Sequence, residues 1–276
     1  MSRIEQALEK AAAARNQQIV PAAAIDPIPS DKHAEINSMD LLLETPPLKI
    51  NNPMLVSMYD NHDAASEEYN KLRSRIITLT QGDEFYNTLM VTSTLGEEGK
   101  TLTSLNLAIT LAKGYDNTVL LVDADLRRPT LHKMLNLKPK VGLIQCLTEN
   151  VPVSEALIKT GIGKLVVLPA GGSVSNPVEL LSSNQMKELV KELKNRYPER
   201  YVIFDTPPIL PFADAQVLAP IVDGCILVVR ESKAKIKDVK EAINSLHDTN
   251  IFGVVYNDAC LYSRKPNYYY YYNHKE

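Results

Sequence analysis

A short segment that contains two glycines is the part of the sequence best suited to do chemistry. Residues 92–101 read Thr-Ser-Thr-Leu-Gly-Glu-Glu-Gly-Lys-Thr, directly after an apolar run and directly before a helical pattern. A loop in this position can turn its backbone N–H groups toward a phosphate at the N-terminus of the helix. The standard P-loop has its first glycine at position 94, where this chain has Thr94. The segment predicts nucleotide binding, and the alternative is a plain glycine turn with a surface lysine.

The side chains of this loop have separate expected roles. Lys100 would contact the terminal phosphates, and the Thr101 hydroxyl would be a ligand of Mg²⁺. ATP and Mg²⁺ are therefore the expected cofactors. The residues expected to bind the nucleotide in and after the loop are Gly96, Glu97, Glu98, Gly99, Lys100, Thr101 and Leu102.

Three aspartates directly follow two other apolar runs. Asp123 and Asp125 come after residues 119–122, and Asp205 comes after residues 201–204. The carboxyl ends of strands in an open parallel sheet meet at the ligand crevice. Carboxylates at that edge can hold Mg²⁺, directly or through water, and can orient an attacking group. The alternative is that all three aspartates are helix N-caps, a role that Asp often fills.

Strands and helices must position these residues. A helix is expected at residues 64–79, and a series of strands and helices follows it. Apolar runs that do not alternate with polar residues predict strands buried on both faces, as in a parallel sheet. The expected fold is therefore an α/β P-loop NTPase, with a doubly wound, mostly parallel sheet and helices on both faces. Strands are expected at 89–91, 119–122, 165–168, 202–204, 225–229 and 252–255, and helices at 100–113, 128–136, 152–160, 178–196, 213–221 and 235–247.

The chain divides into three expected parts. Residues 1–60 should form a short amphipathic helix (2–15) and a flexible linker, which one apolar group (39–43) interrupts. Residues 61–260 should form the catalytic domain. Residues 261–276 form a tail that carries a tyrosine cluster. Five adjacent tyrosines cannot all face one core, so an exposed tail is expected; the five are Tyr268, Tyr269, Tyr270, Tyr271 and Tyr272.

Composition excludes several classes of function. The 276 residues include 30 Lys and Arg and 33 Asp and Glu, and a net charge of −3 argues against a general electrostatic interaction with nucleic acid. No apolar run approaches the ~18 residues of a membrane helix, and the N-terminus lacks the apolar stretch of a secretory signal. The three cysteines are far apart without a CxxC pair, and the five histidines lack metal-ligand spacing. A zinc site is therefore not expected, and a reduced, cytoplasmic setting is.

At these motifs the sequence resembles the bacterial tyrosine kinases of capsule and exopolysaccharide synthesis, especially the stand-alone cytoplasmic autokinases encoded in exopolysaccharide loci. The resemblance rests on the loop at 92–101, on VLLVDADLRRP at 119–129, on VIFDTPP at 202–208 and on the tyrosine-rich tail. The segment at 119–129 is the most specific, because other P-loop ATPases rarely share its two aspartates and arginine. The resemblance covers about residues 66–258 and the tail.

The resemblance implies an ATP-dependent protein-tyrosine kinase that phosphorylates its own tail tyrosines in trans. The implied catalytic residues are Lys100, Asp123, Asp125 and Arg127, and the implied metal ligands are Thr101, Asp125 and Asp205. The residues themselves leave open whether Asp123 or Asp125 is the base, and the resemblance favours Asp123. Arg127 would pair with an acid or anchor its loop, and Asn257 would lie near the adenine.

The resemblance also implies partners. These are a membrane polysaccharide co-polymerase as activator, copies of the same chain in a ring-like homo-oligomer, and a tyrosine phosphatase. The implied location is cytoplasmic, at the inner membrane through that partner, and nucleic acid is not expected as a partner. Relatives often assemble through an ExxRxxR motif, in which this chain has Asn70 in place of the first arginine.

Two other functions remain as alternatives. The first is a partition or positioning ATPase of the ParA/MinD type. Those proteins usually have a lysine five residues before the loop lysine, where this chain has Leu95. The second is a catalytically idle nucleotide-binding scaffold that regulates polysaccharide export, which Lys100, Thr101 and the three aspartates argue against.

Overall fold

The computed structural model describes residues 48, 50–59, 64–82, 84–197 and 199–260. The chain divides into two units, Met1–Asn37 and Ser38–Glu276, and all of the described residues belong to the second. The helix expected at 2–15, the apolar group at 39–43 and the five tail tyrosines lie outside the described residues.

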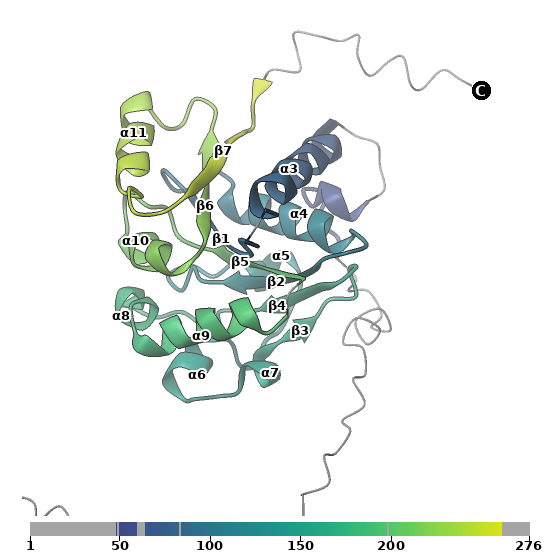
Figure 1. Cartoon of the computed structure of the whole chain (residues 1–276), viewed down its shortest axis with the longest axis vertical. Helices are drawn as coiled ribbons and strands as arrows, with labels where there is room; N and C mark the ends of the chain where they lie inside the picture. Colours follow the sequence, from purple (N-terminus) through teal and green to yellow (C-terminus); the bar gives the residue numbers. More distant parts are fainter. Residues whose placement is uncertain (1–47, 49, 60–63, 83, 198, 261–276) are drawn as a thin grey trace, which may run out of the picture. The chain divides into compact units, whose positions relative to one another are not determined.

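A seven-stranded sheet forms the centre of the described unit (Figure 1). Its order is β3-β4-β2-β5-β1-β6-β7, and only the short β3 runs antiparallel to its neighbour. This confirms the predicted mostly parallel sheet, since all six predicted strands are present. The strands are β1 (Thr88–Ser93), β2 (Thr118–Asp123), β3 (Ile158–Lys159), β4 (Leu165–Leu168), β5 (Arg200–Asp205), β6 (Gly224–Arg230) and β7 (Ile251–Asn257).

Helices cover both faces of this sheet, as predicted for a doubly wound fold (Figure 1). One face packs against α3, α4 and α5, and the other against α6 to α11. The helices are α3 (Ala64–Thr80), α4 (Lys100–Ala112), α5 (Leu131–Met134), α6 (Leu143–Thr148), α7 (Val153–Ala156), α8 (Pro177–Leu181), α9 (Asn184–Asn195), α10 (Asp214–Leu218) and α11 (Ile236–Asn244), with 3₁₀ helices η1 (Val56–Met58) and η2 (Ala219–Ile221).

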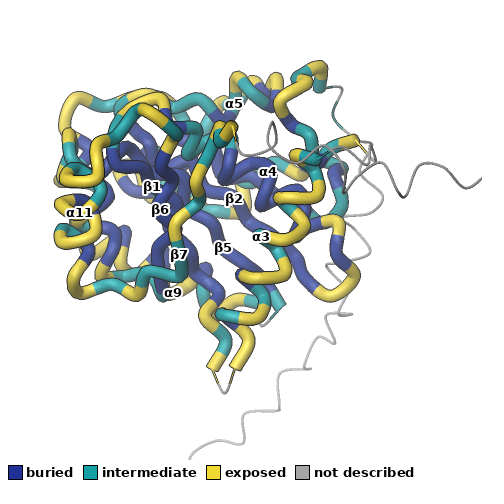
Figure 2. Tube along the Cα trace, turned by 90° about the horizontal axis from the view of Figure 1, so that it is seen from above, coloured by how far each residue is buried: buried dark blue, intermediate teal, exposed yellow. Residues whose placement is uncertain are grey.

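Alternating side chains of the central strands fill the two cores. On β1, Met90 packs into the core on one face, whereas Leu89 and Val91 pack into the core on the other. All six residues of β1, β2 and β5 are buried, and Figure 2 shows these strands enclosed between more exposed helices. Burial on both faces explains why the strands read as continuous apolar runs rather than as alternating patterns.

Two of the predicted helices were wrong in extent. The one at 152–160 ends at Ala156, because Leu157 adopts an extended conformation and Ile158 then pairs with Val167. The one at 178–196 is two helices. Ser183 is the N-cap of the second helix and accepts a hydrogen bond from the backbone of Met186.

Other departures from the predicted elements are smaller. The helix expected at 128–136 shrinks to the four residues of α5, and α10 passes into η2 at Ala219. Helix α6 was not predicted. Its first turn is fixed by Gln145, whose side chain accepts a hydrogen bond from the backbone of Gly142.

The last residues of the segment predicted as a linker pack against the domain. Leu55 is fully buried in the core beside α4. The Ser57 backbone donates to Asn106 Oδ1 at 3.0 Å, and Thr110 Oγ1 donates to Ser57 Oγ at 2.9 Å. Residues 54–58 therefore support the helix that begins at the phosphate loop. In the described part of the chain, every helix is too short or too polar to cross a bilayer.

Leu55→Ala should test whether this segment belongs to the folding unit. Truncating a fully buried leucine removes apolar contacts and leaves a cavity, so the free energy of unfolding should fall by about 2–5 kcal/mol. Urea unfolding measures this change. Met54→Ala is the matched control, because Met54 is 60% exposed and its truncation should cost less than about 0.5 kcal/mol. Equal, small effects of both substitutions would contradict the packing of this segment on α4.

Candidate active site

The phosphate loop lies between β1 and α4, where the sequence placed it. Gly99 is the N-cap of α4 and has a φ of 92°, in the left-handed region that glycine enters without strain. A Cβ atom at this position would also lie 2.1 Å from Asn257 Nδ2. A glycine is therefore required here for both conformation and space, and Lys100 and Thr101 follow it as the first two residues of the helix.

Two neighbouring strands, β2 and β5, deliver the acidic residues beside this loop, which itself follows β1. In the sheet, β5 lies between β2 and β1, and Asp123 pairs in register with Asp205 at the ends of β2 and β5. Asp123 and Asp205 are fully buried, and Asp125 is 5% exposed. The carboxyl edge of the parallel sheet thus brings together the loop and all three predicted carboxylates.

Lys100 is the centre of this cluster. Its Nζ lies 2.7 Å from Asp125 Oδ2 and 4.0 Å from Asp205 Oδ2. Burial disfavours the charged form of Lys100, but Asp205 and Asp125 more than offset that effect, and its pKa is raised. The ammonium group therefore stays charged at neutral pH, as contact with phosphate groups requires.

Thr101 and Ser104 hold Asp205 from the first turns of α4. Thr101 Oγ1 donates to Asp205 Oδ2 at 2.7 Å, and Ser104 Oγ lies 3.1 Å from Asp205 Oδ1. Even so, burial is the largest effect on Asp205 and raises the pKa of its carboxyl group. Ser104 was not predicted as a site residue, although a residue four positions after Lys100 lies on the same face of a helix.

Asp123 has an oxygen atom without a partner. Its Oδ2 accepts a hydrogen bond from the backbone of Leu131 at 3.3 Å, whereas the buried Oδ1 has no hydrogen-bond partner. Burial and the nearby charges of Asp205 and Asp125 raise the pKa of this carboxyl group well above its ordinary value. A buried, unpaired carboxylate oxygen is costly to keep, so its presence here indicates a site that receives a cation or a proton.

The donor set fits Mg²⁺. The candidate ligands Thr101, Asp125 and Asp205 offer hydroxyl and carboxylate oxygens, which this hard cation prefers, and the buried Oδ1 of the neighbouring Asp123 has no partner. Within the described ranges, no three His, Cys, Asp or Glu side chains are close enough to hold an ion by themselves. Mg²⁺ usually keeps several waters and binds through one or two carboxylates and substrate phosphates. This arrangement of side chains therefore matches its coordination preference.

Arg127 contacts an acid outside the cluster. Its Nε donates to both carboxylate oxygens of Asp214, at 3.1 and 3.0 Å, and its guanidinium lies 4.6 Å from the centre of the Phe212 ring. Asp214 is fully buried at the start of α10. These contacts anchor the loop after β2 to α10, which is one of the two roles that the sequence left open for Arg127. No local pattern in the sequence pointed to Asp214 as its partner.

Glu98 and Asn257 fasten the phosphate loop to the ends of β6 and β7. The Glu98 carboxylate accepts hydrogen bonds from the backbones of Leu95, at 2.6 Å, and Arg230, at 3.4 Å. Asn257 Nδ2 donates to the Glu98 carbonyl at 2.8 Å. Burial raises the pKa of Glu98 despite these hydrogen bonds. The structure therefore places Asn257 against the loop.

The other predicted nucleotide-binding residues lie in or just after the loop. Gly96 has open space around its Cα, and Glu97 has an exposed side chain. Leu102 packs against the core, and its carbonyl accepts a hydrogen bond from Asn106. Leu102 therefore reaches the site through its backbone position rather than through its side chain.

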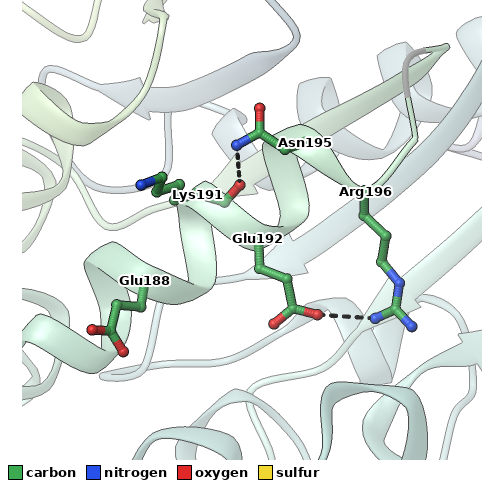
Figure 3. A pocket seen from close by; sticks show the side chains of 5 residues that line it. All are labelled: Glu188, Lys191, Glu192, Asn195 and Arg196. Atoms are coloured by element: carbon green, nitrogen blue, oxygen red, sulfur yellow. Dashed lines mark hydrogen bonds and ion pairs between the residues drawn. The ribbon is translucent and has the colours of Figure 1, made fainter. Parts of the chain in front are cut away.

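A surface hollow on α9 is unrelated to this cluster (Figure 3). Its lining residues all come from α9 and its C-cap, and none follows the carboxyl end of a strand. Arg196 Nη1 pairs with Glu192 Oε1 at 3.0 Å, and Asn195 donates to the Lys191 carbonyl, as Figure 3 shows. These pairings are typical of a solvated helix face.

Comparison with known proteins identifies similar chains. A family model described as an AAA domain matches residues 87–250. The tyrosine-protein kinase YwqD of Bacillus subtilis is 36% identical over 219 residues, which cover 79% of this chain and 90% of that protein. The solved kinase domain of the Escherichia coli tyrosine kinase ETK is 30% identical with a TM-score of 0.70, and the match covers 79% of this chain and 85% of that domain.

Two further similarities are partial. The succinoglycan biosynthesis transport protein ExoP of Rhizobium meliloti is 34% identical over 181 residues, which cover 61% of this chain but only 22% of ExoP. The cell division ATPase MinD of Pyrococcus furiosus is 24% identical with a TM-score of 0.53, over 62% of this chain and 72% of that one. The likeness to MinD shows a shared fold and no more.

Asp123→Asn should stabilise the folded protein at neutral and higher pH. Burial raises the pKa of Asp123, so on raising the pH the unfolded chain loses the carboxyl proton before the folded chain does. The free energy of unfolding therefore falls as the pH rises above the ordinary pKa of an aspartate. The neutral amide removes that loss. Thermal unfolding should give a Tm a few degrees above wild type at pH 8 and a smaller gain at pH 5.

Asp125→Asn is the matched comparison, since it removes the partner of Lys100 rather than an unpaired charge. Its Tm should lie below that of the wild type. A Tm for Asp123→Asn below wild type at both pH values would contradict the account of a costly, unpaired carboxyl group.

Proposed function

Since this chain belongs to the bacterial tyrosine kinases of capsule and exopolysaccharide synthesis, and is therefore a P-loop protein-tyrosine kinase, we propose that it transfers the γ-phosphoryl group of ATP to tyrosines of its own C-terminal cluster. The observation that carries the proposal is the position of Lys100 Nζ, 2.7 Å from Asp125 and 4.0 Å from Asp205 at the carboxyl edge of the sheet. Phosphoryl transfer depends mainly on positioning and on neutralising charge, and this cluster supplies both.

Lys100 and the phosphate loop would bind the triphosphate. The N-terminus of α4 and the backbone N–H groups of the loop attract anions, and Lys100 would turn from Asp125 to the β- and γ-phosphates. This turn would release the Asp125 carboxylate.

Thr101, Asp205 and the released Asp125 would hold Mg²⁺, as the sequence predicted. The ion supplies positive charge that offsets the charge developing on the phosphate oxygens. The hydrogen bond from Thr101 to Asp205 holds these two side chains next to each other, which supports a shared ion. ATP as the nucleotide and Mg²⁺ as the ion are parts of the proposal.

Asp123 would accept the proton of the attacking tyrosine. Its free Oδ1 supports this assignment over Asp125, whose Oδ1 accepts a hydrogen bond from the backbone of Arg128 and whose Oδ2, once released by Lys100, would hold Mg²⁺. A tyrosine has a reference pKa of ~10, and a carboxylate whose pKa is raised is a better match for it than an ordinary one.

Tail tyrosines fit the acceptor role by position and composition. Tyr268 to Tyr272 follow the last described residues by only a few positions. A ring-like homo-oligomer, in which each tail enters a neighbour's site, is the proposed arrangement. Each phosphate would add about −1.5 to −2 charges, so several on one tail would repel each other and the acidic site and loosen the assembly. A tyrosine phosphatase would then remove these phosphates from the tail.

A membrane polysaccharide co-polymerase is the proposed activator. ExoP, named as a transport protein, is more than four times longer than the part that this chain matches. The remaining segment of such relatives indicates the kind of partner, a co-polymerase that would bring the kinase to the inner membrane. A positioning ATPase of the MinD type has less support, because that likeness extends to the fold alone.

Incubation with Mg²⁺ and ATP, followed by an anti-phosphotyrosine blot, should give a signal that Lys100→Met abolishes. Loss of the buried ammonium removes the contact to the phosphates, and activity should fall by about 100-fold or more. Lys138→Met, at an exposed position outside the cluster, is the control and should keep the signal. A signal that survives Lys100→Met would contradict the proposed site.

Transfer between chains needs a mixed sample. One chain carries Lys100→Met with its five tail tyrosines, and the other is active but has all five replaced by Phe and bears a tag that changes its size. Phosphotyrosine should appear on the Lys100→Met chain only when both are mixed. Phosphotyrosine on the active chain without tail tyrosines would place the acceptor elsewhere, and a mixed sample without signal would contradict transfer in trans.

A further inference from the structure

One acidic side chain of the phosphate loop is exposed. Glu97 has a φ of 60°, a left-handed conformation that is uncommon for residues other than glycine, and its side chain is 87% exposed. A carboxylate in this loop would repel a triphosphate unless a cation paired with it. Neither the phosphate contacts nor the transfer step described above uses the Glu97 side chain.

Lys233 is that cation. Its Nζ lies 2.8 Å from Glu97 Oε2, and the two residues are 136 positions apart in the sequence. The pKa of Glu97 is lowered, because Lys233 donates a hydrogen bond to it and attracts its charge, with weaker contributions from Arg230 and Arg128. The exposed side of the loop thus has a cation beside it, Lys233, in addition to Lys100.

The turn that carries Lys233 is fastened to the loop at its base. Lys233 donates its backbone N–H to the Arg230 carbonyl at 3.2 Å. The Arg230 backbone in turn donates to the Glu98 carboxylate, and the Asn257 side chain holds the Glu98 carbonyl. The start of the Lys233 side chain therefore has a fixed place beside the loop, while its end can move.

We propose that Lys233 is a second lysine that binds the phosphate chain of the nucleotide, and that Glu97 holds it at the mouth of the loop before the nucleotide arrives. A triphosphate carries more negative charge than one carboxylate, so Lys233 exchanges one for the other when the loop fills. The exposed ion pair with Glu97 is weak enough to permit this exchange. The inference rests on nucleotide binding at this loop, not on the identity of the phosphate acceptor.

The two partners should affect affinity in opposite directions. Isothermal titration with ADP and with ATP, each with Mg²⁺, measures the Kd. Lys233→Met should raise the Kd about tenfold, the size expected for one charge-assisted hydrogen bond. Glu97→Gln should lower the Kd a few-fold, because it removes a competing anion and keeps the shape of the side chain. Lys235→Met, at an exposed position two residues further on, should leave the Kd within twofold of wild type.

Two results would overturn the inference. If Glu97→Gln and Lys233→Met both raise the Kd, the pair only fixes the shape of the loop. If Lys233→Met binds both nucleotides like the wild type, Lys233 does not contact the phosphates. The readout is binding, so a protein that shows the expected Kd values but makes no phosphotyrosine would reject the proposed function and leave this inference in place.

Discussion

Confinement of three carboxylates around one ammonium group is the constraint on which the rest of the structure depends. Asp123, Asp125 and Asp205 come from the ends of two neighbouring strands that are buried on both faces, and Lys100 starts the helix that packs beside them. Few waters can reach such a cluster, so its charges must be balanced from within. One positive charge cannot balance three negative ones, and the raised pKa values of Asp123 and Asp205 express that deficit.

Much of the surrounding structure keeps this cluster of unbalanced charges in place. The ion pair between Arg127 and Asp214 fixes the loop after β2, and Glu98 fixes the phosphate loop to the end of β6. The segment at 54–58 supports α4 from the far side of its first turns. A protein selected for stability alone would replace Asp123 by a neutral residue. The instability that Asp123 causes is the expected cost of the proposed cation site and proton acceptor.

The sequence predicted the sheet and the site because both obey strong local rules. Continuous apolar runs marked the strands, and the glycines, lysine and aspartates stood at strand ends, where parallel sheets bind ligands. Features that depend on long-range contacts escaped prediction. Ile158 becomes a strand only because Val167 lies beside it, and Arg127 finds Asp214 only in the folded chain. The pairing of Glu97 with Lys233 likewise joins residues that no local pattern connects.

The most direct test of this account is the number of protons released when the nucleotide binds with Mg²⁺. Titration calorimetry in buffers with different ionisation enthalpies measures that number. A cation bound beside Asp123 and Asp205 must lower their raised pKa values. Binding of the nucleotide with Mg²⁺ near neutral pH should therefore release protons, and the Asp123→Asn protein should release fewer protons than the wild type. Binding heats that do not depend on the buffer, or equal release by wild type and Asp123→Asn, would show that the acids around Lys100 do not form the metal and nucleotide site.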